Sequence, residues 1–412
     1  MKTLIKNSFS LLGMQGINYL IPLLTLPYLT RTLGFYNYGL LNTAISIVLY
    51  VILFIDFGFN FSATRDIANN RNNKEKIKKI YNCVIASKII IFLPCLLTII
   101  TAIILSPKSN ILFLIILMLP QIIYAVIFPT WLYQGLEKLS FISICTIISK
   151  LSLLPLLLLF VKKNDDIYVA GIILSWVYLI PLFFNFLYIK KYVPYITIIK
   201  INIRDILITL RDSFTIFLGS ISISLYTLST PIILSMVNNY DQVGYFVATD
   251  KLRVAIIGIF LILGQAIYPR ANILLQESQD KHNIFLRKLI LSQIILGSIS
   301  AILFFIIMPY IAPKILGSDF TDMPLLLKIM APMILLIPLS VIISNLFLLP
   351  YRMNKVYAII PAITLILHLI YAIPLSKYYG AVGSSIAILL TEIISLFILI
   401  FIYIKIRNSH RV

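Results

Sequence analysis

Charged residues are scarce in this sequence. Only 12% of its 412 residues are Asp, Glu, Lys or Arg, and 60% are hydrophobic, whereas soluble domains carry about 25% charged residues. A soluble chain of this length would need a far more polar surface to be solvated by water. The composition therefore excludes a soluble protein and predicts an all-α integral membrane protein.

Cysteine is equally scarce, and its placement excludes a disulfide framework. Cys83, Cys95 and Cys145 form an odd number, all lie in apolar segments, and have no metal-ligand spacing. We expect three free, buried thiols and no metal site or cofactor.

Long polar segments are also absent. The longest polar stretches surround Arg71, Lys200 and Gln279 and span about twenty residues each, too short for a soluble catalytic domain. No cluster of catalytic carboxylates is present either, so we expect no enzymatic activity. At the N-terminus, Lys2 and Lys6 precede an apolar stretch without the cleavage site of a signal peptide, which predicts a first membrane span.

Apolar segments of membrane-spanning length recur along the whole chain. A helix needs about 20 apolar residues to cross the hydrocarbon layer, and twelve such segments can be placed here. Their approximate centres are Leu20, Leu49, Leu93, Leu119, Leu151, Tyr178, Leu225, Ile256, Leu296, Ile337, Ile366 and Leu390.

The 34 Lys and Arg outnumber the 15 Asp and Glu, and they form short clusters between apolar segments. This pattern does not resemble a basic nucleic-acid-binding domain, so we expect no nucleic-acid partner. With the N-terminus in the cytoplasm, most basic residues fall on the cytoplasmic side, including the clusters at 65–79, 190–211 and 270–288. The positive-inside rule then places both termini in the cytoplasm.

The chain shows a weak internal repeat. A shift of 205 residues places Gly39 on Gly244 and Arg65 on Arg270. Parallel halves of this kind are found in transporters that bind substrate at the interface between the halves. The repeat predicts two six-helix bundles, 1–205 and 206–412. Proline near the start of each half, at Pro22 and Pro231, is typical of a hinge or of a static kink.

Four short stretches resemble the polysaccharide flippases, the Wzx-type proteins. Residues 26–34 (LPYLTRTLG), followed by Tyr38 and Gly39, are similar to the opening of that family. Residues 56–68 (DFGFNFSATRDIA) are similar to its signature after the second span. Weaker similarity continues at residues 131–137 (WLYQGLE) and 379–383 (YGAVG).

The resemblance implies membership of the MATE-like superfamily of multidrug, oligosaccharidyl-lipid and polysaccharide exporters. It implies two six-helix bundles around a central cavity, in the bacterial cytoplasmic membrane. The implied substrate is an undecaprenyl-diphosphate-linked oligosaccharide, moved to the outer leaflet by alternating access for O-antigen or capsule synthesis. Membrane lipids, a polysaccharide polymerase and chain-length proteins are implied partners. Twelve spans, rather than fourteen, favour the O-antigen or capsule branch over the peptidoglycan-precursor branch.

Basic residues inside the predicted spans are candidates for binding the diphosphate. Such residues cost about 2.5–3.5 kcal/mol at a helix centre on insertion scales and rarely face lipid. Lys88 and Lys328 lie near span ends, where a lysine can extend to the interface instead. Arg65 and Arg270 lie at the cytoplasmic mouth and either bind the diphosphate or contact lipid phosphates. The substrate-binding candidates are Arg65, Lys150, Lys251, Arg253, Arg270 and Lys328.

Four further residues are candidates for gating or coupling. Asp56 ends the second span, where the helix dipole disfavours a carboxylate, and Arg65 is its nearest cation in sequence; we expect a latch or a direct contact with ion or substrate. Asp250 either pairs with Arg253 at i, i+3 or lines the cavity. Glu392, inside the last span, either takes up a proton or is a structural group. Arg31 completes the set.

Two other functions remain as alternatives. A drug or toxin extruder of the same superfamily would share the architecture, but its usually cationic substrates call for an acidic cavity, whereas the excess charge inside the spans here is positive. A membrane-embedded polymerase or glycosyltransferase would need catalytic carboxylates or a large external loop. The driving ion, H⁺ or Na⁺, is left open.

Overall fold

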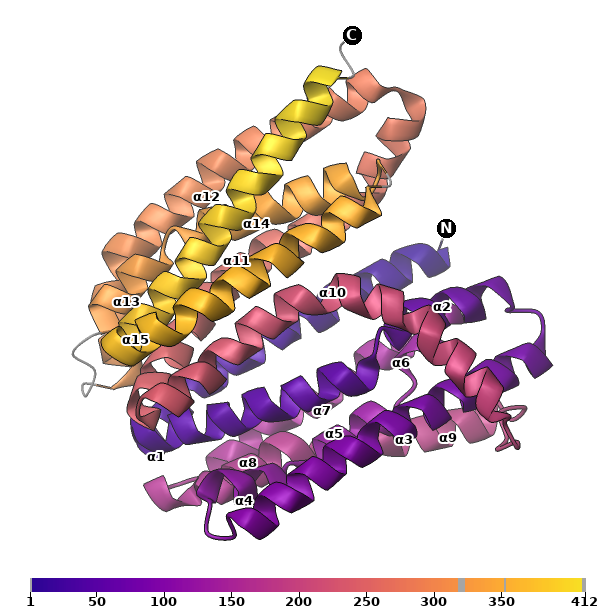
Figure 1. Cartoon of the computed structure of the whole chain (residues 1–412), viewed down its shortest axis with the longest axis horizontal. Coiled ribbons are helices and arrows are strands. Elements are labelled where there is room, and N and C mark those ends of the chain that lie inside the picture. The colour runs from indigo at the N-terminus through magenta and orange to yellow at the C-terminus, as the bar shows by residue number, and fades with distance from the viewer. Residues whose placement is uncertain (1, 318–322, 352, 410–412) are drawn as a thin grey trace. The chain divides into compact units, whose positions relative to one another are not determined.

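The computed structural model describes residues 2–317, 323–351 and 353–409, which are almost wholly helical and contain no strand (Figure 1). The predicted all-α class is therefore confirmed. The helices are α1 (Lys2–Asp56), α2 (Phe59–Asn69), α3 (Lys74–Leu105), α4 (Asn110–Leu117), α5 (Leu119–Ile127), α6 (Thr130–Gly135), α7 (Leu139–Phe160), the 3₁₀ helix η1 (Asn164–Asp166), α8 (Ile167–Trp176), α9 (Leu179–Tyr192), α10 (Ile203–Val237), α11 (Tyr240–Glu277), α12 (Gln279–Leu316), α13 (Met323–Met330), α14 (Met333–Ile343), the π-helix η2 (Ser344–Leu348) and α15 (Asn354–Ser409).

The two longest helices are each interrupted by one glycine. α1 has 55 residues and α15 has 56, and the backbone leaves helical geometry at Gly34 (φ 71°, ψ 166°) and Gly380 (φ 55°, ψ −133°). A side chain would clash with the backbone in these conformations, so glycine is required. At 1.5 Å per residue each helix is about 80 Å long, more than twice the hydrocarbon thickness of about 30 Å. Both are long enough to cross the membrane twice.

The chain reverses direction at Gly380. The hydroxyls of Ser376 and Ser384 lie 2.8 Å apart, and His368 Nδ1 lies 2.8 Å from Thr391 Oγ1. Residues before and after the glycine are therefore paired, and Figure 1 shows the gold and yellow parts of α15 as two rods side by side. In α1 the break also falls at a glycine, Gly34, and not at either of the helix's prolines.

Seven helices among the described residues are long and apolar enough to cross a membrane, or eight if the pair Asn110–Leu117 and Leu119–Gly135, bent by 40°, counts as one span. The chain is thus a multi-pass membrane protein. The predicted number of twelve spans stays a prediction.

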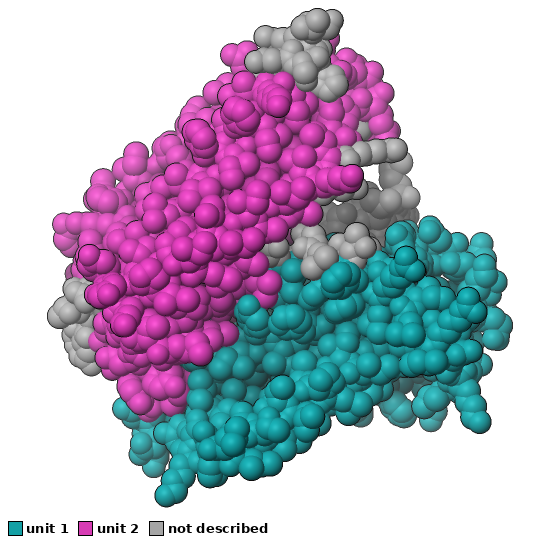
Figure 2. All heavy atoms as spheres, in the orientation of Figure 1, with its two compact units in different colours: residues 1–21, 41–224 teal, residues 22–40, 225–412 magenta. Residues whose placement is uncertain are grey.

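Contacts divide the chain into two compact units (Figure 2). Unit 1 comprises residues 1–21 and 41–224, and unit 2 comprises residues 22–40 and 225–412. The division differs from the predicted bundles 1–205 and 206–412 in two places. Unit 2 includes part of α1, and the first part of α10 belongs to unit 1, where Ser213 Oγ lies 2.7 Å from Ser62 Oγ.

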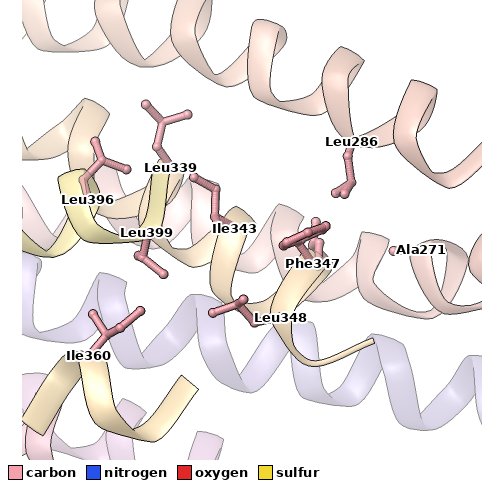
Figure 3. Close-up of a cluster of buried hydrophobic side chains, with 10 residues drawn as sticks. Ala271, Leu286, Leu339, Ile343, Phe347, Leu348, Ile360, Leu396 and Leu399 are labelled. Atoms are coloured by element: carbon pink, nitrogen blue, oxygen red, sulfur yellow. The ribbon is translucent and has the colours of Figure 1, made fainter. Parts of the chain in front are cut away.

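Each unit has its own apolar core. In unit 1, side chains of α2, α3 and α6 meet in a cluster made of Phe59, Ala63, Ile67, Ile77, Val84, Trp131 and Leu132. In unit 2, residues of α11, α12, α14, η2 and α15 form the cluster drawn in Figure 3: Ala271, Leu286, Leu339, Ile343, Leu346, Phe347, Leu348, Ile360, Leu396 and Leu399.

The three cysteines are free, as expected. Cys83 and Cys145 are buried, but Cys95 is only partly buried, so the prediction of burial is wrong for Cys95. This residue lies on α3 between Leu93 and Leu97, which are 56% and 61% exposed. An apolar segment of a membrane helix can face lipid, and apolarity alone therefore does not predict burial in such a protein.

Candidate functional sites

A buried ion pair joins the end of α1 to α3 in unit 1. Lys88 Nζ lies 2.8 Å from Asp56 Oδ1, and the Lys88 side chain is 2% exposed while that of Asp56 is 33% exposed. The same amine also donates to the Ala125 carbonyl at 2.8 Å. A lysine buried in this way is tolerated because both its charge and its protons have partners.

This geometry corrects two predictions. Lys88 does not extend to an interface, because its amine is enclosed by α1, α3 and α5. Asp56 does pair with a cation, but Arg65 is the wrong partner: its Nε lies 3.0 Å from Asp66 at the surface. Sequence distance misled here, because the helix packing of unit 1 brings Lys88, 32 residues away, onto Asp56.

The backbone next to Asp56 is unusual. Phe57 and Gly58 both have positive φ, 39° and 77°, and they separate α1 from α2. The Phe57 ring stacks on Phe217 of α10 with centroids 4.7 Å apart. A Cβ on Gly58 would lie 2.9 Å from the Ser213 carbonyl oxygen. The break between α1 and α2, which follows Asp56 directly, is therefore held in place by α10.

Two of the stretches quoted above meet in unit 1, on α2 and α6. Thr64 Oγ1 lies 3.1 Å from Gln134 Oε1, and Arg71 Nε donates to the Gly135 carbonyl at 2.8 Å. Arg71 Nη1 also pairs with Glu137 at 2.7 Å. The stretch on α2 is thus joined to the stretch on α6 by Thr64 and, from the turn after α2, by Arg71.

A cavity of about 240 Å³ lies between α2, α3 and the first part of α10. Its lining combines three carboxylates with two amines. Lys79 Nζ pairs with Asp205 Oδ2 at 2.9 Å, and Asp66 pairs with Arg65. The charges are mixed, so the cavity does not by itself select an anion or a cation.

Lys150 lies on α7 and is half-buried in unit 1. Its Nζ is 3.2 Å from the Tyr178 hydroxyl and 5.3 Å from the centre of that ring. Within the described part of the chain no carboxylate lies within ion-pair distance of this amine. The positive charge of Lys150 is therefore stabilised by a phenol and its ring, without being neutralised.

Unit 2 contains a second ion pair, on one face of α11. Arg253 donates to Asp250 Oδ1 from Nε at 3.0 Å and from Nη2 at 2.6 Å, and its Nη1 lies 2.9 Å from Met333 Sδ. The Arg253 side chain is 5% exposed, and that of Asp250 is 27% exposed. The predicted i, i+3 pairing is confirmed, and Arg253 is neutralised inside its own helix.

Lys251, on the same helix, contacts the part of α1 that belongs to unit 2. Its Nζ donates to the Tyr38 hydroxyl at 2.8 Å and lies 5.0 Å from the ring centre. Next to Tyr38, Gly39 packs against α11 so closely that a Cβ would lie 2.7 Å from the Gly244 nitrogen. The two glycines that the shift of 205 residues superimposes are therefore in direct contact.

Glu392 is 5% exposed in unit 2 and accepts a hydrogen bond from the Tyr226 hydroxyl at 2.8 Å. Glu392 was predicted to lie well inside the C-terminal bundle, and its burial in unit 2 confirms this. Beside it, His368 is fully buried, with Nε2 3.1 Å from Thr230 Oγ1 and Nδ1 2.8 Å from Thr391 Oγ1. The sequence contains no signal for Tyr226 or Thr230 as partners, because both lie on α10, far from Glu392 and His368 along the chain.

The remaining predicted residues lie at the surface of their units. Arg65, Arg270 and Lys328 are exposed, and Lys328 Nζ lies 5.5 Å from the centre of the Phe305 ring. Arg31 is exposed and donates to the backbone carbonyl of Lys314. No binding or gating role is assigned to these four by their contacts.

A family model described as "Polysaccharide biosynthesis protein" matches residues 4–275. The chain belongs to this family. A curated relative from Escherichia coli (strain K12), named "Putative O-antigen transporter", is 31% identical over 388 residues, which covers 94% of this chain and 93% of the relative. A relative of the same name from Shigella dysenteriae is also 31% identical, over 94% of this chain and 97% of its own length.

Solved structures show the same fold. The lipid II flippase MurJ superimposes with a TM-score of 0.72 at 16% identity, over 96% of this chain and 87% of MurJ. A multidrug resistance MATE family transporter of the MOP superfamily superimposes with a TM-score of 0.71 at 14% identity, over 95% and 98%. The predicted family and the MATE-like fold class are thus confirmed.

Proposed function

We propose that this chain is a flippase that moves undecaprenyl-diphosphate-linked oligosaccharide repeat units from the cytoplasmic to the outer leaflet of the bacterial cytoplasmic membrane, for O-antigen or capsule synthesis. The observation that carries this proposal is the 31% identity, over 94% of the chain, to a relative named as an O-antigen transporter. In this proposal both termini lie in the cytoplasm, the protein performs no covalent chemistry, and polymerase and chain-length proteins act on the product.

The chemistry of the substrate favours a basic group within the membrane that is not neutralised by the protein. A diphosphate carries negative charge, which is costly to move through hydrocarbon unless a cation stabilises it. Lys88 and Arg253 are bound to carboxylates in their own units. Lys150 and Lys251 each contact a phenol, Tyr178 and Tyr38. Of these two we assign the strongest interaction with the diphosphate to Lys150, which lies next to Leu151, the centre of its predicted span.

Lys150, which has a phenol as its partner, and Arg253, which is paired with a carboxylate, should give different phenotypes when they are replaced. Lys150→Met should lower transport at least tenfold at unchanged protein level, because no carboxylate is left unpaired by the change. Arg253→Met should instead lower the protein level, because it leaves the half-buried carboxylate of Asp250 without its partner. Membrane protein level and surface polysaccharide, measured in parallel for each variant, check both expectations.

Lys150→Arg serves as the matched control, because it keeps the charge next to Tyr178. Normal polysaccharide from Lys150→Met at normal protein level would contradict the assignment.

We propose Glu392 as the group that couples transport to an ion gradient, H⁺ or Na⁺. Support comes from its burial and from a partner that is a neutral phenol, Tyr226. A buried carboxylate of this kind can bind a proton or cation and release it when its surroundings change. Glu392→Gln, which keeps the shape and removes the charge, should abolish the response of transport to an imposed gradient.

Deletion of the gene in its host tests the proposed function. The flippase predicts loss of surface polysaccharide and accumulation of single lipid-linked repeat units on the cytoplasmic side. Normal polysaccharide together with altered drug sensitivity would instead indicate the multidrug extruder, which shares the fold.

A further inference from the structure

A second pocket, of about 440 Å³, opens in unit 2 among α11, α14, η2 and the start of α15. Its volume is within the range of small-molecule binding sites, about 300–1,000 Å³. Half of the lining residues are aliphatic. Four lining residues have polar ends, two amides and two phenols: Gln265, Tyr268, Asn345 and Tyr357.

The two amides have no hydrogen-bond partner among the described residues of the chain. Gln265 is exposed and Asn345 is half-buried, and both lie on helices whose composition is that of a membrane protein. An amide next to hydrocarbon is costly unless a ligand or water satisfies its donors and acceptors. The pocket therefore offers unsatisfied hydrogen-bonding capacity beside apolar and aromatic surface.

The wall that carries Asn345 is a π-helix, η2 (Ser344–Leu348). Single π-turns within helices are frequently found at functional sites. The Leu346 carbonyl oxygen of η2 lies 3.0 Å from Nε2 of the fully buried His282. Ile343, Phe347 and Leu348, on the neighbouring positions, pack into the core of unit 2 (Figure 3). These contacts hold η2 against the core of unit 2, and the packing therefore fixes the position of Asn345.

The opposite wall is one face of α11. Leu261, Gly264, Gln265 and Tyr268 follow the i, i+3, i+4, i+7 spacing of a single helix face. A Cβ built on Gly264 would meet nothing within 4 Å, so open space lies directly above its backbone. A ligand can approach the helix closely at this point.

The pocket lies along the second half of α11, just ahead of Arg270, and beside Tyr357 in the first turn of α15, next to Lys355. The charge distribution predicts that this end faces the cytoplasm. A lipid-linked sugar enters from that side, according to the proposed function. Hydroxyl groups bind amides, and the apolar C–H faces of a sugar ring pack on aromatic rings. The pocket has both kinds of partner.

We infer that this pocket binds the sugar portion of the lipid-linked oligosaccharide, with Gln265 and Asn345 bonding its hydroxyls and Tyr268 and Tyr357 packing against its rings. This inference rests on the proposed function and adds to it the place where the sugar is recognised.

The test compares two lipids on the purified full-length protein in detergent. One probe is undecaprenyl diphosphate that carries the host's repeat unit, extracted from the deletion strain, and the other is undecaprenyl diphosphate without sugar. Dissociation constants are measured by native mass spectrometry. The double variant Gln265→Ala, Asn345→Ala should bind the glycosylated lipid at least tenfold more weakly, since each lost hydrogen bond weakens binding about five- to tenfold. Its affinity for the sugar-free lipid should be unchanged.

Two controls accompany the double variant. Gln276→Ala removes an exposed glutamine from the same helix outside the pocket and should change neither affinity. Gly264→Leu should fill the pocket and act like the double variant, while Gly264→Ala, which is smaller, should have a lesser effect. Size-exclusion profiles and melting temperatures show whether each variant is folded.

Unchanged affinity for the glycosylated lipid in the double variant and in Gly264→Leu would overturn the inference. An equal loss of affinity for both lipids would also overturn the inference, because it would indicate that the pocket binds the prenyl chain. If the unaltered protein prefers neither lipid over an ordinary phospholipid, the proposed function fails as well, and this result is distinguishable from the other two.

Discussion

Replacing Gly39 with alanine should remove most of the folded protein from the membrane. The added Cβ would lie 2.7 Å from the Gly244 nitrogen and 2.8 Å from the Tyr240 carbonyl carbon. These neighbours are backbone atoms of α11 and cannot rotate away as a flexible side chain could. Forcing the helices apart should cost about 3 kcal/mol, a large part of the stability of a typical domain. Fluorescence-detected size exclusion of the solubilised protein measures the loss.

Gly16→Ala is the matched control, because it lies on the same helix and its Cβ would meet nothing within 4 Å. Alanine also favours a helix over glycine by about 1 kcal/mol. Equal yields of folded protein from Gly16→Ala and Gly39→Ala would contradict the close packing of α1 on α11. A drop for Gly244→Ala as well is expected, since its Cβ would lie 3.0 Å from the Phe35 carbonyl carbon.

Replacing Lys88 with methionine should destabilise unit 1 by about 1–3 kcal/mol, the usual effect of leaving hydrogen-bond acceptors without their buried donor. Methionine fills nearly the same volume, so the cost comes from Asp56 and the Ala125 carbonyl, both of which lose the Lys88 amine. The drop in melting temperature of the purified protein measures this cost.

The double variant Asp56→Asn, Lys88→Met shows how much of the lost stability comes from the unpaired charge of Asp56, because both new side chains keep nearly the same shape without charge. It removes both charges, so it should recover a substantial part of the stability lost by Lys88→Met. If the double variant were as unstable as the sum of its single changes, the two side chains would not interact and the ion pair would be refuted. Recovered stability without recovered transport would show that the pair also acts in the transport cycle.

Much of the fold could be predicted from the sequence, because membrane helices leave a strong signal. The apolar segments predicted the helical class, and the stretches at residues 26–34 and 379–383 led to the family. Their glycines, Gly34 and Gly380, prove to be the points where the two longest helices are interrupted. A glycine in such a stretch is informative because few other residues tolerate that backbone conformation.

The partners of the polar residues could be predicted only where they are close in sequence. The pairing of Asp250 with Arg253, three residues away, is one of the two alternatives that the sequence leaves open, and the structure shows this pair. Asp56 was assigned to Arg65 because proximity along the chain was the only guide, whereas helix packing selects Lys88. The hydrogen bond between Glu392 and Tyr226, 166 residues away, could likewise not be predicted from the sequence. Contacts between helices depend on packing geometry, which hydropathy does not encode.

Reconstitution of the purified protein into liposomes that contain the lipid-linked oligosaccharide tests whether the chain moves this lipid between leaflets. An enzyme that modifies the sugar is added outside, so that it reaches outer-leaflet lipid alone. If the chain is a flippase, the modified fraction should rise from the outer-leaflet share toward the whole pool, and Lys150→Met should slow this rise at least tenfold. A fraction that stays at the outer-leaflet share, with correctly folded protein in the liposomes, would contradict the account.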